Sequence, residues 1–150
     1  MITVRLANAQ TDISAIMEGA RNFASRVDFP ALFPKDDAAF VSVVERIMSL
    51  DGMEVLLAEH EEKFVGALGV LYSPYLWNPE RIVATEIFWW TRENAPFRTA
   101  RVMMDETMKR IEAKGAIPVF VALETSPDGV GKLYRKLGMA PIETSFMRFF

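Results

Sequence analysis

The sequence predicts one α+β domain over residues 1–150, with a mixed β-sheet and the element order β-α-α-β-β-β-α-β-α-β. Two observations lead to this prediction. The short polar turn at residues 60–62 joins two largely apolar runs, which is typical of an antiparallel hairpin. Residues 86–123 read as a strand, a helix and a second strand, and a helical connection places two such strands parallel. The length suits a single domain.

The composition is that of an ordinary folded protein, with 51% apolar and 25% charged residues. The net charge of −3 gives no general attraction to nucleic acid or to an anionic membrane. The chain has no cysteine and one histidine, so a disulfide, a cysteine nucleophile and a multi-histidine metal centre are excluded, and we expect no metal. No segment reads as a signal peptide or a membrane span, so we expect a cytoplasmic protein.

The first half of the chain begins with a strand at residues 2–6, where apolar and polar side chains alternate. Thr11 or Asp12 then caps a helix, and a second helix begins near Asp36. In both helices the apolar residues recur at the spacing of one buried face. These residues are Ile13, Ile16, Met17, Ala20, Phe23 and Ala24 in the first helix, and Phe40, Val43, Val44, Ile47 and Met48 in the second.

Three strands follow the two helices. The first two lie at residues 54–59 and 63–72 and form the hairpin. Two prolines and an asparagine predict a loop at residues 73–80. The third strand follows this loop and ends at Trp90, which predicts a three-strand antiparallel meander.

The last part of the chain alternates helices and strands. Residues 99–114 have the pattern of an amphipathic helix, and residues 117–123 are nearly all apolar, as in a strand buried on both faces. A further helix begins at Asp128 and is ended by Gly138. An aromatic-rich strand at residues 145–150 completes the predicted fold.

The junction between the strand ending at Trp90 and the helix at residues 99–114 is a candidate anion site. The first N–H groups of a helix lack intrahelical partners, and the helix dipole is positive there. Arg98 and Arg101 lie in the first turn of this helix, where cations oppose the dipole. A negatively charged ligand bound nearby would explain both arginines.

Three local strings resemble the GNAT superfamily of acyl-CoA-dependent N-acetyltransferases. Residues 133–141 (Leu-Tyr-Arg-Lys-Leu-Gly-Met-Ala-Pro) resemble the family motif L-Y-x-K-x-G-F near the C-terminus. Residues 83–90 (Val-Ala-Thr-Glu-Ile-Phe-Trp-Trp) resemble the fourth strand of a subgroup found in phage genomes, and residues 64–68 resemble the third strand of the fold. The resemblance extends over nearly the whole chain, with strand order and lengths that agree.

This resemblance implies an α/β sandwich, in which a mixed, mostly antiparallel sheet of six or seven strands has helices on both faces. In that fold the fourth and fifth strands splay apart and admit the cofactor. The implied function is transfer of an acetyl group from acetyl-CoA, as co-substrate, to a primary amine by direct attack in a ternary complex. The lack of cysteine agrees with direct transfer.

Glu86 and Tyr134 are the candidate catalytic residues. Glu86 lies in an aromatic strand, either as a carboxylate at the sheet surface or paired with a nearby arginine such as Arg81, or, as the resemblance implies, as a general base acting through water. Phe88 and Trp90 are expected on the same face, where apolar surroundings would raise its pKa. Tyr134 is either a packing aromatic residue or, as the resemblance implies, the general acid that reprotonates the CoA thiolate.

The resemblance also implies how acetyl-CoA would be bound. The main chain of residues 88–91 (Phe88, Trp89, Trp90 and Thr91) would bond the pantetheine arm, near a β-bulge that the family has at this point. The first turn of the next helix would bind the diphosphate, through Arg98, Thr99, Ala100, Arg101 and Val102. Ser126 would replace a polar residue, commonly Asn, that the family keeps after the fifth strand and that is Pro127 here.

The diphosphate loop departs from the family pattern (Q/R)-x-x-G-x-(G/A). Ala95 and Arg98 stand at the first position and at the middle glycine, and only Ala100, at the last position, fits. A side chain at the middle position hinders close approach of the backbone to a diphosphate, whereas an arginine offers charge-assisted hydrogen bonds to phosphate. The departure leaves open a non-catalytic module of the same fold that acts as a protein-binding or regulatory, inhibitory factor.

The sequence does not identify the acceptor amine, which is a small molecule or a protein. Residues 27–37 and 73–80 are expected to line its pocket. The acidic residues Glu59, Glu61 and Glu62 either form a solvated turn or attract a cationic acceptor. A homodimer that uses exposed aromatic residues and the strand at residues 145–150 is a further alternative.

Overall fold

The computed structural model describes residues 1–26, 32–123 and 128–148. Its strands form one sheet in the order β1-β2-β3-β4-β5, in which only β4 and β5 are parallel. None of the helices in these ranges is long and apolar enough to cross a membrane. The elements are β1 (Ile2–Leu6), α1 (Ile13–Arg26), α2 (Asp37–Met48), β2 (Met53–His60), β3 (Lys63–Tyr75), β4 (Asn78–Thr91), α3 (Thr99–Ala113), β5 (Ile117–Val119) and α4 (Asp128–Lys136).

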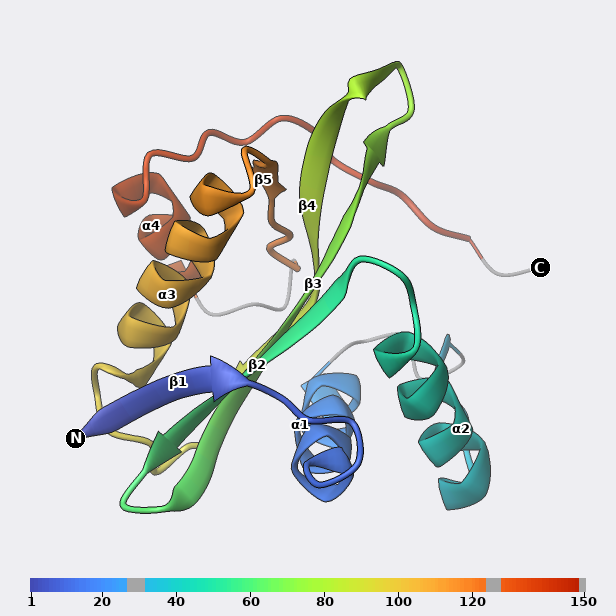
Figure 1. The fold of residues 1–150 in the computed structure, drawn as a ribbon, viewed down its shortest axis with the longest axis vertical. Coiled ribbons are helices and arrows are strands. Elements are labelled where there is room, and N and C mark those ends of the chain that lie inside the picture. Colours follow the sequence, from blue (N-terminus) through green and yellow to red (C-terminus); the bar gives the residue numbers. More distant parts are fainter. Residues whose placement is uncertain (27–31, 124–127, 149–150) are drawn as a thin grey trace.

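Helices cover both faces of the sheet, α1 and α2 on one face and α3 and α4 on the other (Figure 1). Each pair of helices closes a separate hydrophobic core, as the α+β sandwich predicts. The α1/α2 core consists of Ile16, Met17, Phe40, Val44, Val55, Leu57, Ala67 and Phe88. The α3/α4 core consists of Ala58, Val65, Leu68, Val70, Ala84, Met103, Met104, Ile111, Val130 and Tyr134.

The predicted cap of α2 and the predicted hairpin turn are confirmed, whereas the Asp12 carboxylate accepts hydrogen bonds from Arg5 and from the amide of Asn8 instead of capping α1. Asp36 caps α2, because its side chain accepts a hydrogen bond of 2.8 Å from the amide of Ala39. The tight turn between β2 and β3 places Glu61 and Glu62 at φ angles of 50° and 62°, the left-handed values that a two-residue hairpin turn requires. The predicted hairpin therefore forms with the predicted turn.

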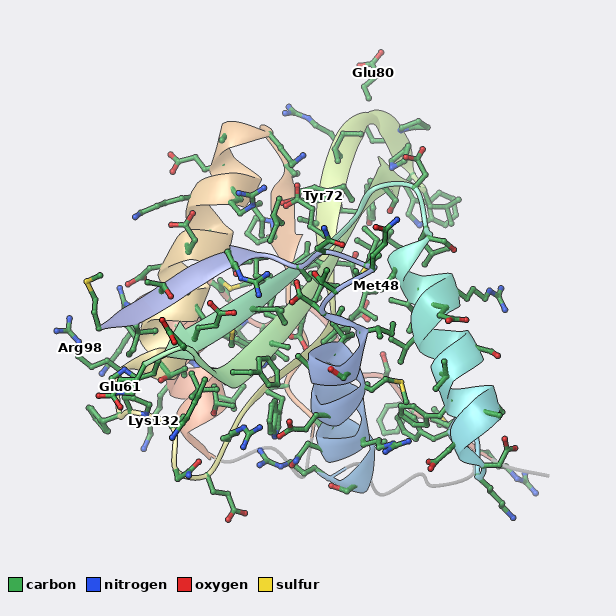
Figure 2. The ribbon with its side chains drawn as sticks, turned by 60° about the horizontal axis from the view of Figure 1, so that its bottom comes forward. Met48, Glu61, Tyr72, Glu80, Arg98 and Lys132 are labelled. Carbon is green, nitrogen blue, oxygen red and sulfur yellow. The ribbon has the colours of Figure 1, made fainter. Side chains whose placement is uncertain are left out.

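The loop predicted at residues 73–80 is instead a continuation of the sheet. Strands β3 and β4 extend to Tyr75 and Asn78 and form an arm that projects beyond the other strands (Figure 1). The arm pairs only β3 with β4, and a proline without an N–H group is tolerated at such an edge. Its tip exposes Leu76 and Trp77, 81% and 83% accessible, and Figure 2 shows Glu80 at this end of the molecule.

The strand predicted at residues 145–150 is absent from residues 145–148, and residues 149–150 lie outside the described ranges. The described sheet has five strands instead of six or seven, and β5 is shorter than the predicted 117–123. A strand needs a partner edge for its backbone N–H and C=O groups, and residues 139–148 belong to no strand of the described sheet. In this tail the side chains of Ile142 and Phe146 are 77% and 94% exposed.

Candidate active site

The candidate site is built on β4, and a β-bulge in this strand determines which side chains reach the site. Glu86 pairs with Val70 of β3, whereas Phe88 pairs with Gly69, so Ile87 is an extra residue on β4. This is the bulge that the family resemblance implies. Gly69 leaves room for the ring of Phe88, because a Cβ at this glycine would lie 2.6 Å from that ring.

The bulge places Glu86 and Phe88 on opposite faces of the sheet. Phe88 belongs to the α1/α2 core, and Trp90 packs on Phe64 at the edge of that core, with 5.6 Å between ring centroids. Glu86 faces the α3/α4 core, where it contacts Tyr134. The expectation that Phe88 and Trp90 surround Glu86 is therefore wrong, because the expectation assumed regular alternation along the strand.

Strands β4 and β5 separate at this point, as the resemblance implies. Among the described residues they pair over residues 83–85 of β4, with Ile117–Val119, and β4 then continues to Thr91 paired with β3. Beyond the paired part, the side chain of Glu86 reaches across and accepts a hydrogen bond of 3.0 Å from the amide of Val121. Where the next backbone hydrogen bond between β4 and β5 would lie, the amide of Val121 is thus bound by the Glu86 carboxylate instead.

Glu86 and Tyr134 are in direct contact in this opening. The Tyr134 hydroxyl lies 3.0 Å from Glu86 Oε2, and each of the two residues is 7% exposed. The same hydroxyl lies 3.0 Å from the carbonyl oxygen of Val121 and accepts a hydrogen bond of 2.9 Å from Trp89 Nε1. The two predicted catalytic side chains therefore share one buried hydrogen-bond network.

Burial changes the acidity of both groups. It raises the pKa of Glu86 to about 7, against the hydrogen bonds from Val121 and Tyr134, which favour the ionised carboxylate. Burial also raises the pKa of Tyr134 above its ordinary range, and the neighbouring Glu86 carboxylate raises it further. At neutral pH Tyr134 is therefore a neutral phenol, whereas Glu86 gains and loses a proton close to pH 7.

The start of α3 offers hydrogen-bond donors without partners. Thr99 donates its amide to Pro96 at 2.8 Å, but no partner is seen for the amides of Ala100 and Arg101 in the described part of the chain. The hydroxyl of Thr99 is buried and also has no described partner. These groups are donors of the kind that an anion site needs, and the anion site predicted at this junction stays a prediction.

The two arginines of this turn point to different neighbours. Arg101 forms an ion pair with Asp105, one turn along α3, at 2.9 Å. Arg98 lines a surface pocket of about 450 Å³ with His60 and Phe97 on the side of β1. Figure 2 shows Arg98 and Glu61 at the same end of the molecule. Contact of both guanidinium groups with one diphosphate therefore stays a prediction.

Several other predicted site residues are not brought into this network. The side chain of Val102 lines the pocket beside Arg98. Glu59 pairs with Arg5 of β1 at 2.7 Å, which ties it into the sheet surface. Ser126 lies outside the described residues, as does part of the acceptor segment 27–37. The roles predicted for Ser126 and for the acceptor segments stay untested.

The sequence analysis missed two contributors to the network. It assigned only the main chain of Trp89, whose indole N–H in fact donates to Tyr134. It assigned nothing to Val121, whose N–H and C=O groups both contact the catalytic pair. The tryptophan was visible in the motif at residues 83–90, but the bulge that turns it toward the α3/α4 core has no signal in the sequence.

Comparison with known proteins gives matches at the level of structure. No protein-family model matches the sequence, and no curated protein matches it. A ribosomal-protein-alanine N-acetyltransferase from Brucella melitensis biovar Abortus 2308 matches with a TM-score of 0.76 and 16% identity, over 100% of this chain and 99% of that one. A transcriptional regulator from Bacillus halodurans C-125 matches with a TM-score of 0.78 and 18% identity, over 100% of both chains.

A third match is a predicted acetyltransferase from Clostridium acetobutylicum, solved with acetyl-CoA. Its TM-score is 0.71 at 14% identity, over 99% of this chain and 96% of that one. All three similarities extend over nearly the full length of both chains, although few residues are identical. The chain therefore has the fold of these proteins, two of which are described as acetyltransferases.

Proposed function

We propose that this protein transfers an acetyl group from acetyl-CoA to a primary amine by direct attack in a ternary complex. The observation that carries the proposal is the separation of β4 from β5, with Glu86 and Tyr134 in contact at the opening. A fold similar to acetyltransferases, one of them solved with acetyl-CoA, supports it. The acceptor is a small molecule or a protein.

Two sets of main-chain groups suit the co-substrate. Along residues 88–91, β4 pairs with β3 and has no described strand partner on its β5 side, so the N–H and C=O groups that face the β5 side are available to the pantetheine arm. The amides of Ala100 and Arg101, with the hydroxyl of Thr99, are available to the diphosphate. N–H groups near Trp90 and Thr91 would polarise the thioester carbonyl.

The chemistry requires an amine without its extra proton and a leaving thiolate that gains one. Glu86 is the general base, because its pKa near 7 lets the carboxylate accept a proton at neutral pH. Tyr134 is the side chain that donates a proton to sulfur. We expect Glu86→Gln and Tyr134→Phe each to lower kcat by about 10²- to 10⁴-fold, the range of general acid–base catalysis.

The first test is isothermal titration calorimetry with acetyl-CoA, CoA and dephospho-CoA. We expect micromolar binding of acetyl-CoA, weakened about ten- to hundredfold by Arg98→Ala or Arg101→Ala, since one charge-assisted hydrogen bond contributes about 1.5–3 kcal/mol. Lys109→Ala, an exposed cation farther along α3, is the matched control and should bind as the wild type does. A panel of amines is then screened for thiol release. No binding at millimolar acetyl-CoA would contradict the proposal.

A second candidate function is a protein-binding or regulatory module of the same fold that does not catalyse. The observation that favours it is Arg98, which stands at the position of the middle glycine and lines a pocket on the β1 side. The two candidates differ in a simple measurement. Tight acetyl-CoA binding together with turnover that Tyr134→Phe abolishes supports the enzyme, whereas absence of cofactor binding in the wild type supports the module.

We further propose a cytoplasmic protein that binds neither nucleic acid nor membrane, in line with its net charge of −3. A homodimer is proposed as its assembly. Phe146 and Met147 of the described tail are 94% and 55% exposed, and large apolar side chains of this kind are common at subunit contacts. Light scattering on the purified protein distinguishes a dimer from a monomer, and Phe146→Ser should shift a dimer toward the monomer.

A further inference from the structure

The Tyr134 hydroxyl has three polar neighbours within hydrogen-bonding distance. Trp89 Nε1 lies at 2.9 Å, Glu86 Oε2 at 3.0 Å and the carbonyl oxygen of Val121 at 3.0 Å. An indole N–H only donates, a main-chain carbonyl only accepts, and a tyrosine hydroxyl has one proton to give. When Glu86 is ionised, the hydroxyl therefore has two acceptors within reach and can serve one of them at a time.

A proton on Glu86 gives this network a second arrangement of hydrogens without moving any heavy atom. Protonated Glu86 donates to the Tyr134 oxygen, and Tyr134 turns its own proton to the carbonyl of Val121. Trp89 donates to the Tyr134 oxygen in both arrangements. When Glu86 is ionised, Tyr134 and the amide of Val121 both donate to its Oε2. The same heavy-atom positions thus suit both protonation states.

The surroundings restrict where this proton can go. The Tyr134 ring packs edge-on against Phe120, with 5.6 Å between centroids. Apolar residues of the α3/α4 core pack around the network: Met103, Met104 and Ile111 of α3, Val130 of α4, and Ala58, Val65, Leu68, Val70 and Ala84 of the sheet. Among the described residues, Glu86 and Tyr134 are the titratable groups of the network.

The acidities of the two groups differ in a way that matters for catalysis. Burial and the adjacent Glu86 carboxylate raise the pKa of Tyr134, so release of its proton to leave a tyrosinate is unfavourable. Tyr134 is therefore a poor acid by itself. Glu86, whose pKa burial raises to about 7, releases a proton far more readily. If Tyr134 receives a proton from Glu86 while it donates its own, no tyrosinate forms.

We propose that a proton relay runs from Glu86 through Tyr134 to the CoA sulfur. In this relay Trp89 is the positioning residue, whose indole N–H holds the Tyr134 oxygen beside Glu86. The relay rests on the acyl transfer proposed above. In that reaction the amine nitrogen forms a bond to the acyl carbon, and the carbon–sulfur bond breaks with its electron pair on sulfur. The nitrogen loses two protons, one to solvent and one to Glu86. As Tyr134 protonates sulfur, Glu86 passes its proton to Tyr134.

The first experiment measures the network in the free protein, without any substrate. Carbon-13 NMR of glutamate-labelled protein follows the Glu86 carboxyl through a pH titration, with Glu86→Gln to assign its resonance. We expect a wild-type midpoint near pH 7. Tyr134→Phe should raise the midpoint, because it removes a donor to the ionised carboxylate. Trp89→Phe should raise it by a smaller amount, because the indole polarises the hydroxyl that donates to Glu86.

Trp90→Phe is the matched control for this titration. It removes the same indole group one residue along the chain, and Trp90 Nε1 has no hydrogen-bond partner in the described part of the chain. Its midpoint should equal that of the wild type. A wild-type midpoint at the ordinary value for glutamate, or a midpoint that moves equally in Trp89→Phe and Trp90→Phe, would overturn the proposed network.

The second experiment measures the relay during turnover with acetyl-CoA and the best amine from the screen. We expect Trp89→Phe to lower kcat about five- to tenfold, the effect of one neutral hydrogen bond, with KM for acetyl-CoA changed less than twofold. The wild-type kcat is then measured in mixtures of light and heavy water. Its dependence on the fraction of heavy water should be that of a rate-determining step in which two protons are transferred. A single proton in motion would overturn the relay. Absence of any acetyl transfer would instead overturn the proposed function, while the titration would still decide whether the network exists.

Discussion

Glu86 and Phe88 are two residues apart on β4 and lie on opposite faces of the sheet. In a regular strand such residues share a face. The extra residue Ile87 reverses the alternation, so that Glu86 meets Tyr134 on the α3/α4 side while Phe88 fills the α1/α2 core. The bulge therefore decides which side chains accompany the candidate general base.

The bulge depends on the absence of a side chain at Gly69. A Cβ at this position would lie 2.6 Å from the Phe88 ring and 2.8 Å from Met53 Cε, so Gly69→Ala should destabilise the protein by about 1–3 kcal/mol. Urea unfolding measures this loss. Gly129→Ala in α4 is the control, because a Cβ there meets nothing within 4 Å, and it should be neutral or slightly stabilising. Equal stability of the two variants would contradict the packing described at the bulge.

The raised pKa of Glu86 predicts a specific pH dependence of stability. The folded protein binds this proton more tightly than the unfolded chain does, because the pKa is about 7 instead of the ordinary 4.5. The stabilisation is complete below about pH 4.5 and is lost as the pH rises through 7. Between those values the wild type should lose about 3 kcal/mol relative to Glu86→Gln, which stays neutral throughout.

Urea unfolding of the wild type and of Glu86→Gln at pH 5 and at pH 8 tests this dependence. The free energy of unfolding of Glu86→Gln, relative to that of the wild type, should be higher at pH 8 than at pH 5. Substitution of the exposed Glu112 by Gln is the control, and its difference from the wild type should be the same at both pH values. A Glu86→Gln difference that does not change with pH would show that the carboxyl group does not titrate in a buried site.

Thr99 offers a substitution whose effects on stability and on binding should have opposite signs. Thr99→Val removes a buried hydroxyl that has no described partner, so the free protein should become more stable by up to about 1 kcal/mol. If that hydroxyl donates to the diphosphate, the same variant should bind acetyl-CoA several-fold more weakly. Thermal unfolding with and without acetyl-CoA measures both effects.

Thr107→Val is the matched control for this experiment. Thr107 is equally buried in α3, but its hydroxyl donates to the carbonyl of Met103 at 2.8 Å. Its substitution should destabilise the free protein slightly and leave acetyl-CoA binding unchanged. If Thr99→Val also binds acetyl-CoA as the wild type does, the Thr99 hydroxyl does not contribute to the proposed diphosphate site.

Glu54 ties α3 to the sheet, far along the helix from the proposed site. Burial alone would raise its pKa, but hydrogen bonds from Arg110 and Lys114, both at 3.1 Å, lower the pKa on balance. The resulting stability is present above about pH 4.5 and is lost as the pH falls through the lowered value. Glu54→Gln should therefore cost about 1–3 kcal/mol at pH 7 and little at pH 3.

This prediction is checked by urea unfolding at the two pH values. Glu106→Gln is the control, since Glu106 forms its ion pair with Lys109 at the surface, at 3.7 Å, and such pairs contribute little. A similar loss in both variants at pH 7 would mean that the partly buried position of Glu54 adds nothing.

The sequence by itself determined the order of the elements from β1 to α4, the cap of α2 at Asp36 and the hairpin turn. These features depend on local chemistry: the spacing of apolar residues, a side chain that satisfies a free amide, and residues that accept a tight turn. They are readable because each is decided within a few positions along the chain. The resemblance at residues 133–141 directed attention to Tyr134 for the same reason.

Only the tertiary structure decided how those residues meet. Glu86 and Tyr134 are 48 positions apart, and their contact depends on the bulge at Ile87 and on the packing of α4 against the sheet. The role of the Trp89 indole depends on the same bulge, which arises from pairing with another strand. The arm of β3 and β4 and the irregular tail at residues 145–148 were mispredicted because a strand forms only where a partner edge exists. Pairing and packing across the sheet, which local sequence does not encode, therefore assembled the proposed site.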